Sequence, residues 1–453
     1  MNKIIRETHL TTQTQKSATS PASFVALLPL FAFLALFIGA GVYFQSQGVD
    51  FAFYQLPSVI AILPAIILAL LLSKQKLNQS IDTFIAGIGH SNIIAMCLIY
   101  LLAGAFASVA KATGGVDATV ALGLSMIPSN LLLPGFFVIA AFIATAMGTS
   151  MGTIAAVAPI ALGVADQAQI DYALMAGAVL SGALFGDNLS IISDTTIAST
   201  RTQGCEMKDK FRENLIFSLP ASAIALVLFA IAGQGQADIA AQEIDFINVI
   251  PYLTILFLAV SGVNVFVVLT VGILLAGATG LFTMDYSAVQ FGQDIYAGFT
   301  NMQEIFILSM LVGGLAALMT QQGGLTFVSQ KIESLIARFS KAKGDASPRA
   351  AELGMAGMVA ATNVCVANNT VSIVVVGDIA KDLASKHGVA PKRAASVLDI
   401  FACIIQGLIP HGAQALLIAS TFAISPLAAI SHAWYCMILA VVAISIVILR
   451  KRA

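Results

Sequence analysis

The stretch GALFGDNLSIISDTTIAST, residues 182–200, places two carboxylates in a chain that is otherwise apolar. Asp187 and Asp194 stand among Ser, Thr and Asn, and the stretch contains no Lys or Arg to pair with them. An ionisable side chain at membrane depth costs about 2.5 to 3.5 kcal/mol on insertion scales, so such a residue marks a functional site by default. The first question is whether this chain lies in a membrane.

The composition is that of an integral membrane protein. Of the 453 residues, 58% are hydrophobic and 10% are charged, whereas soluble domains carry about 25% charged residues. Apolar runs at residues 24–44, 51–72 and 433–449 have the ~17 to 25 residues that cross a bilayer as a helix. The strict alternation of a β-barrel is absent, so we predict an all-α polytopic membrane protein.

Charge and cysteine content narrow the class of protein further. The net charge is −1 and no basic domain is present, which gives no support for a nucleic-acid partner. The five cysteines lack CxxC or Cys/His spacing, so we expect neither disulfides nor a metal centre, and no cofactor. No convincing nucleophile and base pair is present either, so we expect a protein that is not an enzyme.

The chain contains an internal repeat. GHSNIIAMCLIYLLAGAFASVAKATGG, residues 89–115, aligns without gaps on GFTNMQEIFILSMLVGGLAALMTQQGG, residues 298–324, with seven identical pairs. Composition alone would give about two or three. Further on, ATAMGTSMGT parallels AATNVCVANNT, and GDNLS parallels IPHGA, each of the last two being followed by AST. We therefore predict two copies of one unit, at residues 22–232 and 246–450.

The distribution of Lys and Arg predicts the orientation, because loops rich in these residues stay cytoplasmic. Lys210 belongs to one of five basic clusters that mark the inside. These clusters lie at residues 74–76, 201–212, 331–349, 381–393 and 450–452. Segments without bases mark the outside, at residues 45–50, 233–245, 283–294 and 425–431. We expect a cytoplasmic tail at residues 1–21 and a cytoplasmic C-terminus.

This orientation requires two hairpins that enter and leave the membrane on the same side. Residues 133–164 return to the outside and residues 350–379 return to the inside. Each hairpin is followed by an interrupted helix, at residues 172–200 and 394–423. About five crossings per copy then turn the second copy upside down. The predicted fold is thus two inverted repeats of about five transmembrane helices, each with a re-entrant hairpin and an interrupted helix.

Polar residues concentrate at four predicted breaks, at residues 148–153, 186–190, 362–370 and 410–414. Irregular backbone in hydrocarbon is tolerated only where it lines a polar cavity, and its oxygens suit a small dehydrated cation. We therefore predict an ion or substrate site, with Asp187, Asn188 and Asp194 as sodium ligands. The candidate residues are Asp187, Asn188, Ser190, Ser193, Asp194, Thr195, Thr149, Ser150, Thr153, Thr362, Asn363, Asn368, Asn369, Thr370, His411 and Gln414.

Several of these residues also have a plainer explanation. A helix cap beside a break accounts for Asp187 or Asp194 as well, and His411 is explained equally by a satisfied core histidine or by proton transfer. Asp399 lies close to a predicted span end, where snorkelling accounts for its charge. Asn92 occupies the same position as Asn301 in the aligned repeat, and we assign its amide to helix packing.

The string GDNLSIISDTT within residues 182–200 resembles the signature of the NhaC family of sodium/proton antiporters, and SGVNVFVVLTVGILLAG, residues 261–277, is similar to that family as well. The resemblance extends over about residues 51–450. It implies membership of the ion transporter superfamily, with two inverted repeats, a homodimer and an elevator motion. The positions that match the family string are Asp187, Asn188, Ser190, Ser193, Asp194 and Thr195.

The predicted function is Na⁺/H⁺ antiport across a bacterial inner or plasma membrane. A proton and a sodium ion compete for the same carboxylate oxygens, and this competition is the minimum that an antiporter requires. The alternative is sodium-coupled or proton-coupled transport of a small carboxylate or amino acid, because four polar breaks offer more hydrogen bonds than one sodium ion uses. A channel is disfavoured because the chain shows no repeated filter sequence.

Single cysteines at Gln169 and Lys386 test the predicted orientation. A membrane-impermeant thiol reagent added to intact cells should label Gln169→Cys, since we place it outside, and should reach Lys386→Cys only after the membrane is opened. The native cysteines are first replaced, and the parent without cysteines is the control. Equal labelling of both positions in intact cells would contradict the orientation.

Overall fold

The computed structural model contains helices as its only regular elements in the residues that it describes, which confirms the all-α class. The described residues are 21–47, 49, 55–126, 128–191, 193–233, 245–328, 330, 331, 334 and 348–449. Within them, seven helices are long and apolar enough to cross a membrane. The expected tail at residues 1–21 lies outside the described residues except for Pro21.

The first half of the chain runs from α1 to α10. Its elements are η1 (Val25–Leu27), α1 (Leu28–Ser46), α2 (Ser58–Leu71), α3 (Leu77–Ile88), α4 (Ser91–Ala112), α5 (Gly115–Met126), η3 (Ser129–Leu131), α6 (Leu132–Met147), α7 (Ser150–Ala168), α8 (Tyr172–Leu189), α9 (Asp194–Gln203) and α10 (Met207–Ala232). Helices α7 to α9 contain the polar segments that the sequence singled out.

The second half runs from α11 to α21. Its elements are α11 (Phe246–Val260), α12 (Val265–Thr283), α13 (Ala288–Asn301), α14 (Gln303–Gln321), α16 (Pro348–Val366), α17 (Asn369–Lys386), α18 (Pro391–Gln406), α19 (Ala413–Phe422), α20 (Pro426–Ser431) and α21 (Trp434–Leu449). The turn between α11 and α12 ends at Asn264, whose side chain accepts from the N–H of Phe266 and caps α12.

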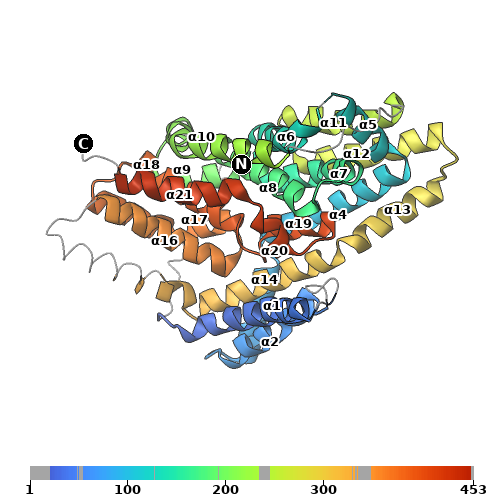
Figure 1. Cartoon of the computed structure of the whole chain (residues 1–453). Coiled ribbons are helices and arrows are strands. Elements are labelled where there is room, and N and C mark those ends of the chain that lie inside the picture. Colours follow the sequence, from blue (N-terminus) through green and yellow to red (C-terminus); the bar gives the residue numbers. More distant parts are fainter. Residues whose placement is uncertain are drawn as a thin grey trace, which may run out of the picture.

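Helices in the two halves make matching contacts. Helix α3 packs on α14 and α13 packs on α4, while α2 packs on α14 and α12 packs on α4 (Figure 1). Likewise α7 contacts α19, and α17 contacts α9. Each of these contacts is repeated with the roles of the two halves exchanged. This exchange of roles is the pattern expected if the two halves are copies of one unit.

The same relation holds for single side chains where α4 meets α14. The hydroxyl of Ser309 donates to Tyr100 Oη at 3.2 Å, and these residues are 209 positions apart. The thiol of Cys97 lies 3.6 Å from the carbonyl oxygen of Phe306, again 209 positions apart. The offset of the aligned repeat is also 209. Equivalent positions of the two sequence copies therefore contact each other at this crossing.

The helices are interrupted at four places that lie close to polar residues. Helices α6 and α7 are separated by a turn in which Gly148 has φ of 71°, and α16 and α17 by a turn in which Ala367 has φ of 51°. The break between α8 and α9 covers residues 190–193, and the break between α18 and α19 covers residues 407–412. These breaks bring eight helix ends toward the same region.

Two breaks lie at other residues than predicted. The interruption expected at residues 410–414 covers residues 407–412, so Gln414 lies in α19. The other difference has a packing reason. We expected the interruption at residues 186–190, but Gly186 lies inside α8. A Cβ there would overlap the carbonyl oxygen of Ala141 in α6. The glycine thus permits close packing of α8 on α6, and the helix continues to Leu189.

Glycines also set the distance between α4 and α13. A Cβ built on Gly104 would overlap the carbonyl oxygen of Gly298, and one built on Gly298 would overlap that of Gly104. Gly292 in the same helix α13 has open space around its Cβ position. The close approach of α4 therefore requires glycine at Gly298, whereas the glycine at Gly292 is not required by any neighbouring helix.

Gly298→Ala should destabilise the protein by about 1 to 3 kcal/mol, the usual cost of overpacking. The matched control is Gly292→Ala on the same helix, which should be neutral or slightly stabilising because alanine has the higher helix propensity. Thermal unfolding of both purified variants in detergent measures the difference. Equal melting temperatures for the two variants would contradict the packing argument.

Candidate functional site

Residues at the four breaks and in the first half of α4 line a partly open cavity of about 100 Å³. Every break contributes to it, as do both halves of the chain. The residues that line it are Asn92, Ala95, Met96, Ile99, Gly148, Thr149, Ser150, Met151, Asp187, Asp194, Thr195, Asn368, Asn369, Thr370, Gln406 and Gln414. Oxygen-bearing side chains dominate the list, so the cavity is a polar pocket in an apolar protein.

Asp187 is the buried carboxylate of this cavity. It lies in the last turn of α8 and is 4% exposed. The hydroxyl of Ser150, in the first turn of α7, donates to Asp187 Oδ2 at 2.9 Å. One hydroxyl is a weak partner for a buried carboxylate, since burying a charge is costly unless it is paired or well hydrogen-bonded.

A chain of hydrogen bonds continues from Asp187 into the other half of the protein. Gln414 Nε2 donates to Ser150 Oγ at 3.1 Å, and Gln406 Nε2 donates to Gln414 Oε1 at 2.7 Å. The Gln406 amide also lies 3.2 Å from the carbonyl oxygen of Ala367, in the turn before α17. This series of hydrogen bonds thus connects all four breaks, and it explains why the helix ends converge.

Three of the helices begin at the cavity with capped first turns. Thr149 accepts from the N–H of Gly152 in α7, Ser193 from that of Thr196 in α9, and Asn368 from that of Val371 in α17. Asp194 is exposed and occupies the first turn of α9, where the helix dipole favours negative charge. Free N–H groups at such ends favour an anionic group, while the side-chain oxygens favour a cation.

Nine of the sixteen predicted residues line this cavity. They are Thr149, Ser150, Asp187, Asp194, Thr195, Asn368, Asn369, Thr370 and Gln414. Seven do not line it, namely Asn188, Ser190, Ser193, Thr153, Thr362, Asn363 and His411. Asn92, which we assigned to helix packing, lines the cavity, and so does Gln406, which was not singled out.

Three of the seven have partners that hold them elsewhere. Thr153 is buried and its hydroxyl donates to the carbonyl oxygen of Thr149 within α7. The Asn363 amide donates to the carbonyl oxygen of Ala402 at 2.8 Å. His411 is buried, with Nε2 3.0 Å from the carbonyl oxygen of Val364. The contacts of Asn363 and His411 join two elements around the cavity, whereas the contact of Thr153 stays within its own helix.

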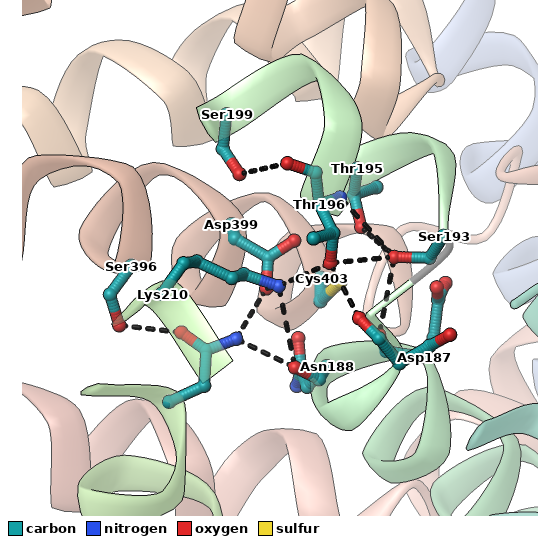
Figure 2. Close-up of polar contacts among 12 residues, drawn as sticks. Asp187, Asn188, Ser193, Thr195, Thr196, Ser199, Lys210, Ser396, Asp399 and Cys403 are labelled. Carbon is teal, nitrogen blue, oxygen red and sulfur yellow. Dashed lines mark hydrogen bonds and ion pairs between the residues drawn. The ribbon is translucent and has the colours of Figure 1, made fainter. Parts of the chain in front are cut away.

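Asn188 does not line the cavity, and its contacts belong to a second polar region. Its Nδ2 donates to Tyr435 Oη at 2.9 Å, and its carbonyl oxygen accepts from Asn214 Nδ2 at 2.7 Å. Figure 2 shows this second polar cluster, with the carboxyl of Asp187 pointing away from it. Two adjacent residues of the signature therefore serve two different polar regions.

An ion pair that the sequence did not predict lies at the centre of the second cluster. Lys210 Nζ is 2.8 Å from Asp399 Oδ2, and both side chains are 0% exposed. We counted Lys210 with the bases of a cytoplasmic loop and explained Asp399 by snorkelling at a span end. Both assignments were wrong, because Lys210 lies within α10 and both side chains are buried. The pair is buried because α10 and α18 pack against each other and against α8.

A periodic signal in α10 was available in the sequence. Lys210, Asn214, Ser218 and Ser222 recur every four residues in a helix that is otherwise largely apolar, and all four are buried. A polar stripe of this period faces one neighbour. We attributed Lys210 to charge in a loop, and the stripe was overlooked.

The buried carboxylates differ in whether a basic side chain balances their negative charge. Asp399 pairs with Lys210, and Glu352 pairs with Arg393 at 2.9 Å. Asp187 has no ion pair with any described residue. The described residues also contain no group of three His, Cys, Asp or Glu side chains that could hold a metal ion. The oxygens available to a sodium ion are those of Asp187, the hydroxyls of the two hairpin turns and the nearby amides.

Comparison with known proteins identifies the family of the chain. The sequence profile described as the Na⁺/H⁺ antiporter family matches residues 1–234, more than half of the chain. The chain is 27% identical to the Na⁺/H⁺ antiporter NhaC of Bacillus subtilis over 399 residues, covering 80% of this chain and 85% of that protein. It is 26% identical to NhaC of Alkalihalophilus pseudofirmus, covering 72% and 76% of the two chains.

A further relative is named for a different activity. The malate-2H⁺/Na⁺-lactate antiporter of Bacillus subtilis is 31% identical over 239 residues, covering 51% of this chain and 48% of that protein. The resemblance inferred from residues 182–200 is confirmed by the profile and by the NhaC relatives. The chain is a multi-pass membrane protein that belongs to the Na⁺/H⁺ antiporter family, with NhaC antiporters among its relatives.

Proposed function

We propose that this protein exchanges Na⁺ for H⁺ and that Asp187 is the carboxylate on which the two ions compete. The observation that carries the proposal is that no basic side chain pairs with Asp187 in the described residues. Among the buried carboxylates of the described residues, Asp399 and Glu352 each have a basic partner, whereas Asp187 has one hydroxyl. A buried carboxylate in that position is stable when it holds either a proton or a cation.

The surroundings of Asp187 support both occupants. A proton on the carboxyl keeps the bond to Ser150 Oγ and removes the charge. A sodium ion needs several oxygens, and the cavity offers the hydroxyls of Thr149 and Thr370 together with the amide of Asn369. Because both occupants use the carboxylate oxygens, loading one excludes the other, which is the coupling step of antiport.

The packing of the helices supports an elevator form of alternating access. Helices α6 to α10 pack with α16 to α21 around the breaks, and α1 to α4 pack with α11 to α14 (Figure 1). We propose that the first body, which holds the four breaks, moves against the second, whose helix α4 lines the remaining side of the cavity, with the hairpins and the inverted repeats arranged as the basic loops predict. A homodimer, cytoplasmic termini and a bacterial inner or plasma membrane belong to the same proposal.

A second candidate function has its own support. The capped starts of α7, α9 and α17 at the cavity suit a carboxylate of an organic solute, and one relative is a malate-2H⁺/Na⁺-lactate antiporter. In that case the same cavity binds a small carboxylate or amino acid with sodium or protons. We rank it second because the NhaC relatives align over 72% to 80% of this chain, whereas the malate-2H⁺/Na⁺-lactate antiporter aligns over 51% of it.

Asp187→Asn should abolish Na⁺-driven proton movement, lowering it at least tenfold to the rate of vesicles without protein, because the amide has no exchangeable charge. Reconstituted vesicles with an internal pH dye measure the rate after a Na⁺ pulse. The matched control is Asp171→Asn, at the exposed cap of the same helix, since asparagine caps equally well. Wild-type activity of Asp187→Asn would refute the assignment.

The two candidate functions differ in their need for an organic solute. In vesicles given Na⁺ alone, antiport predicts a proton flux without any addition, and malate or lactate should change the initial rate by less than twofold. Choline chloride serves as the control for ionic strength. A flux that appears only after an organic acid or amino acid is added would establish the second candidate and exclude the first.

A further inference from the structure

The ammonium of Lys210 fills a cage of oxygens at the break between α8 and α9. Its Nζ lies 2.6 Å from Thr196 Oγ1, 2.8 Å from Asp399 Oδ2 and 3.4 Å from the carbonyl oxygen of Asn188. An ammonium has three N–H donors and no acceptor, so these three oxygens satisfy it. The contacts come from α8, α9 and α18, which Lys210 joins from its place on α10 (Figure 2).

The cage is held by groups other than Lys210. Asn214 Nδ2 donates to Asp399 Oδ2 and to the carbonyl oxygen of Asn188, each at 2.7 Å. The hydroxyl of Thr196 donates to the carbonyl oxygen of Ser190 at 2.7 Å, which fixes the direction of its lone pairs. These bonds do not require the ammonium, so the three oxygens remain gathered when the lysine side chain is shortened.

The donor set is suited to a small monovalent cation. One carboxylate, one hydroxyl and one backbone carbonyl are the oxygen ligands that hard cations take from proteins. Two further oxygens of the same cluster, Asp399 Oδ1 and Asn188 Oδ1, are buried and lack a hydrogen-bond partner in the described part of the chain. Acceptors without donors at this depth add to the attraction for a cation.

We propose that Lys210 is a resident cation occupying a second cation site, which keeps Asp399 out of the exchange reaction and leaves that reaction to Asp187. Lys210 is also a positioning residue, because it holds the carbonyl of Asn188, the residue next to Asp187. When the ammonium is removed, the cage takes a small monovalent cation from solution. The role in exchange rests on the proposed function, but the occupancy of the cage does not.

The test is made in an Asp187→Asn background, so that cation binding at Asp187 makes no contribution. Three full-length proteins are purified in detergent at alkaline pH: D187N, D187N/K210A and D187N/K210A/D399N. Melting temperatures are recorded with increasing NaCl, KCl or NH₄Cl, and choline chloride holds the ionic strength constant. A cation that binds the folded state raises the melting temperature with its concentration.

The expected result is a rise of several degrees with at least one of the three cations in D187N/K210A, and none in D187N or D187N/K210A/D399N. If D187N/K210A purifies only in the presence of such a cation, the proposal is supported in the same way. It is overturned if the three proteins respond alike. It is also overturned if D187N/K210A fails to fold in every salt while the neutral triple variant folds, since the cage then accepts no cation. Neither outcome bears on exchange at Asp187, which is tested separately.

Discussion

Backbone groups that lose their helical partners inside a membrane have to be satisfied within the protein, and this constraint organises the whole molecule. Side chains at one break form hydrogen bonds with polar groups at another break. Gln406, at the end of α18, donates both to the turn before α17 and to Gln414 at the start of α19. Gln414 in turn reaches Ser150 beside the turn after α6. The cavity exists because the breaks meet and complete one another.

Charge is distributed over the two faces of a single helix end. Asp187 faces the cavity with a hydroxyl as its partner, and the adjacent Asn188 presents its carbonyl oxygen to Lys210 and Asn214. On the second face the positive charge of Lys210 is balanced because Asp399 supplies a negative charge. The carboxylate without an ion pair therefore lies next in the sequence to a residue whose carbonyl oxygen contacts the buried Lys210.

Close approach of helices makes this arrangement possible. Gly186 lets α8 lie against α6, and Gly104 and Gly298 let α4 lie against α13. Where α4 meets α14, Tyr100 and Ser309 contact each other from equivalent positions of the sequence repeat. The matching contacts of the two halves follow from these crossings. In an apolar solvent, such packing and such polar contacts are the main sources of association between helices.

The sequence by itself determined the all-α membrane class, the family and much of the cavity. Long apolar runs have few alternatives in a bilayer, and polar residues such as Asp187, Ser150 and Asn368 stand out against them. The family string located the helix end that carries the carboxylate.

Only the tertiary structure decided which face each polar side chain takes and which charges meet. Asn188 and Asp187 are adjacent, yet helix geometry turns one toward Tyr435 and the other toward the cavity. Lys210 and Asp399 are 189 positions apart, and no local pattern links them. Their pairing is set by the packing of α10 on α18, because ion pairing depends on distance in space, which one-dimensional spacing does not contain.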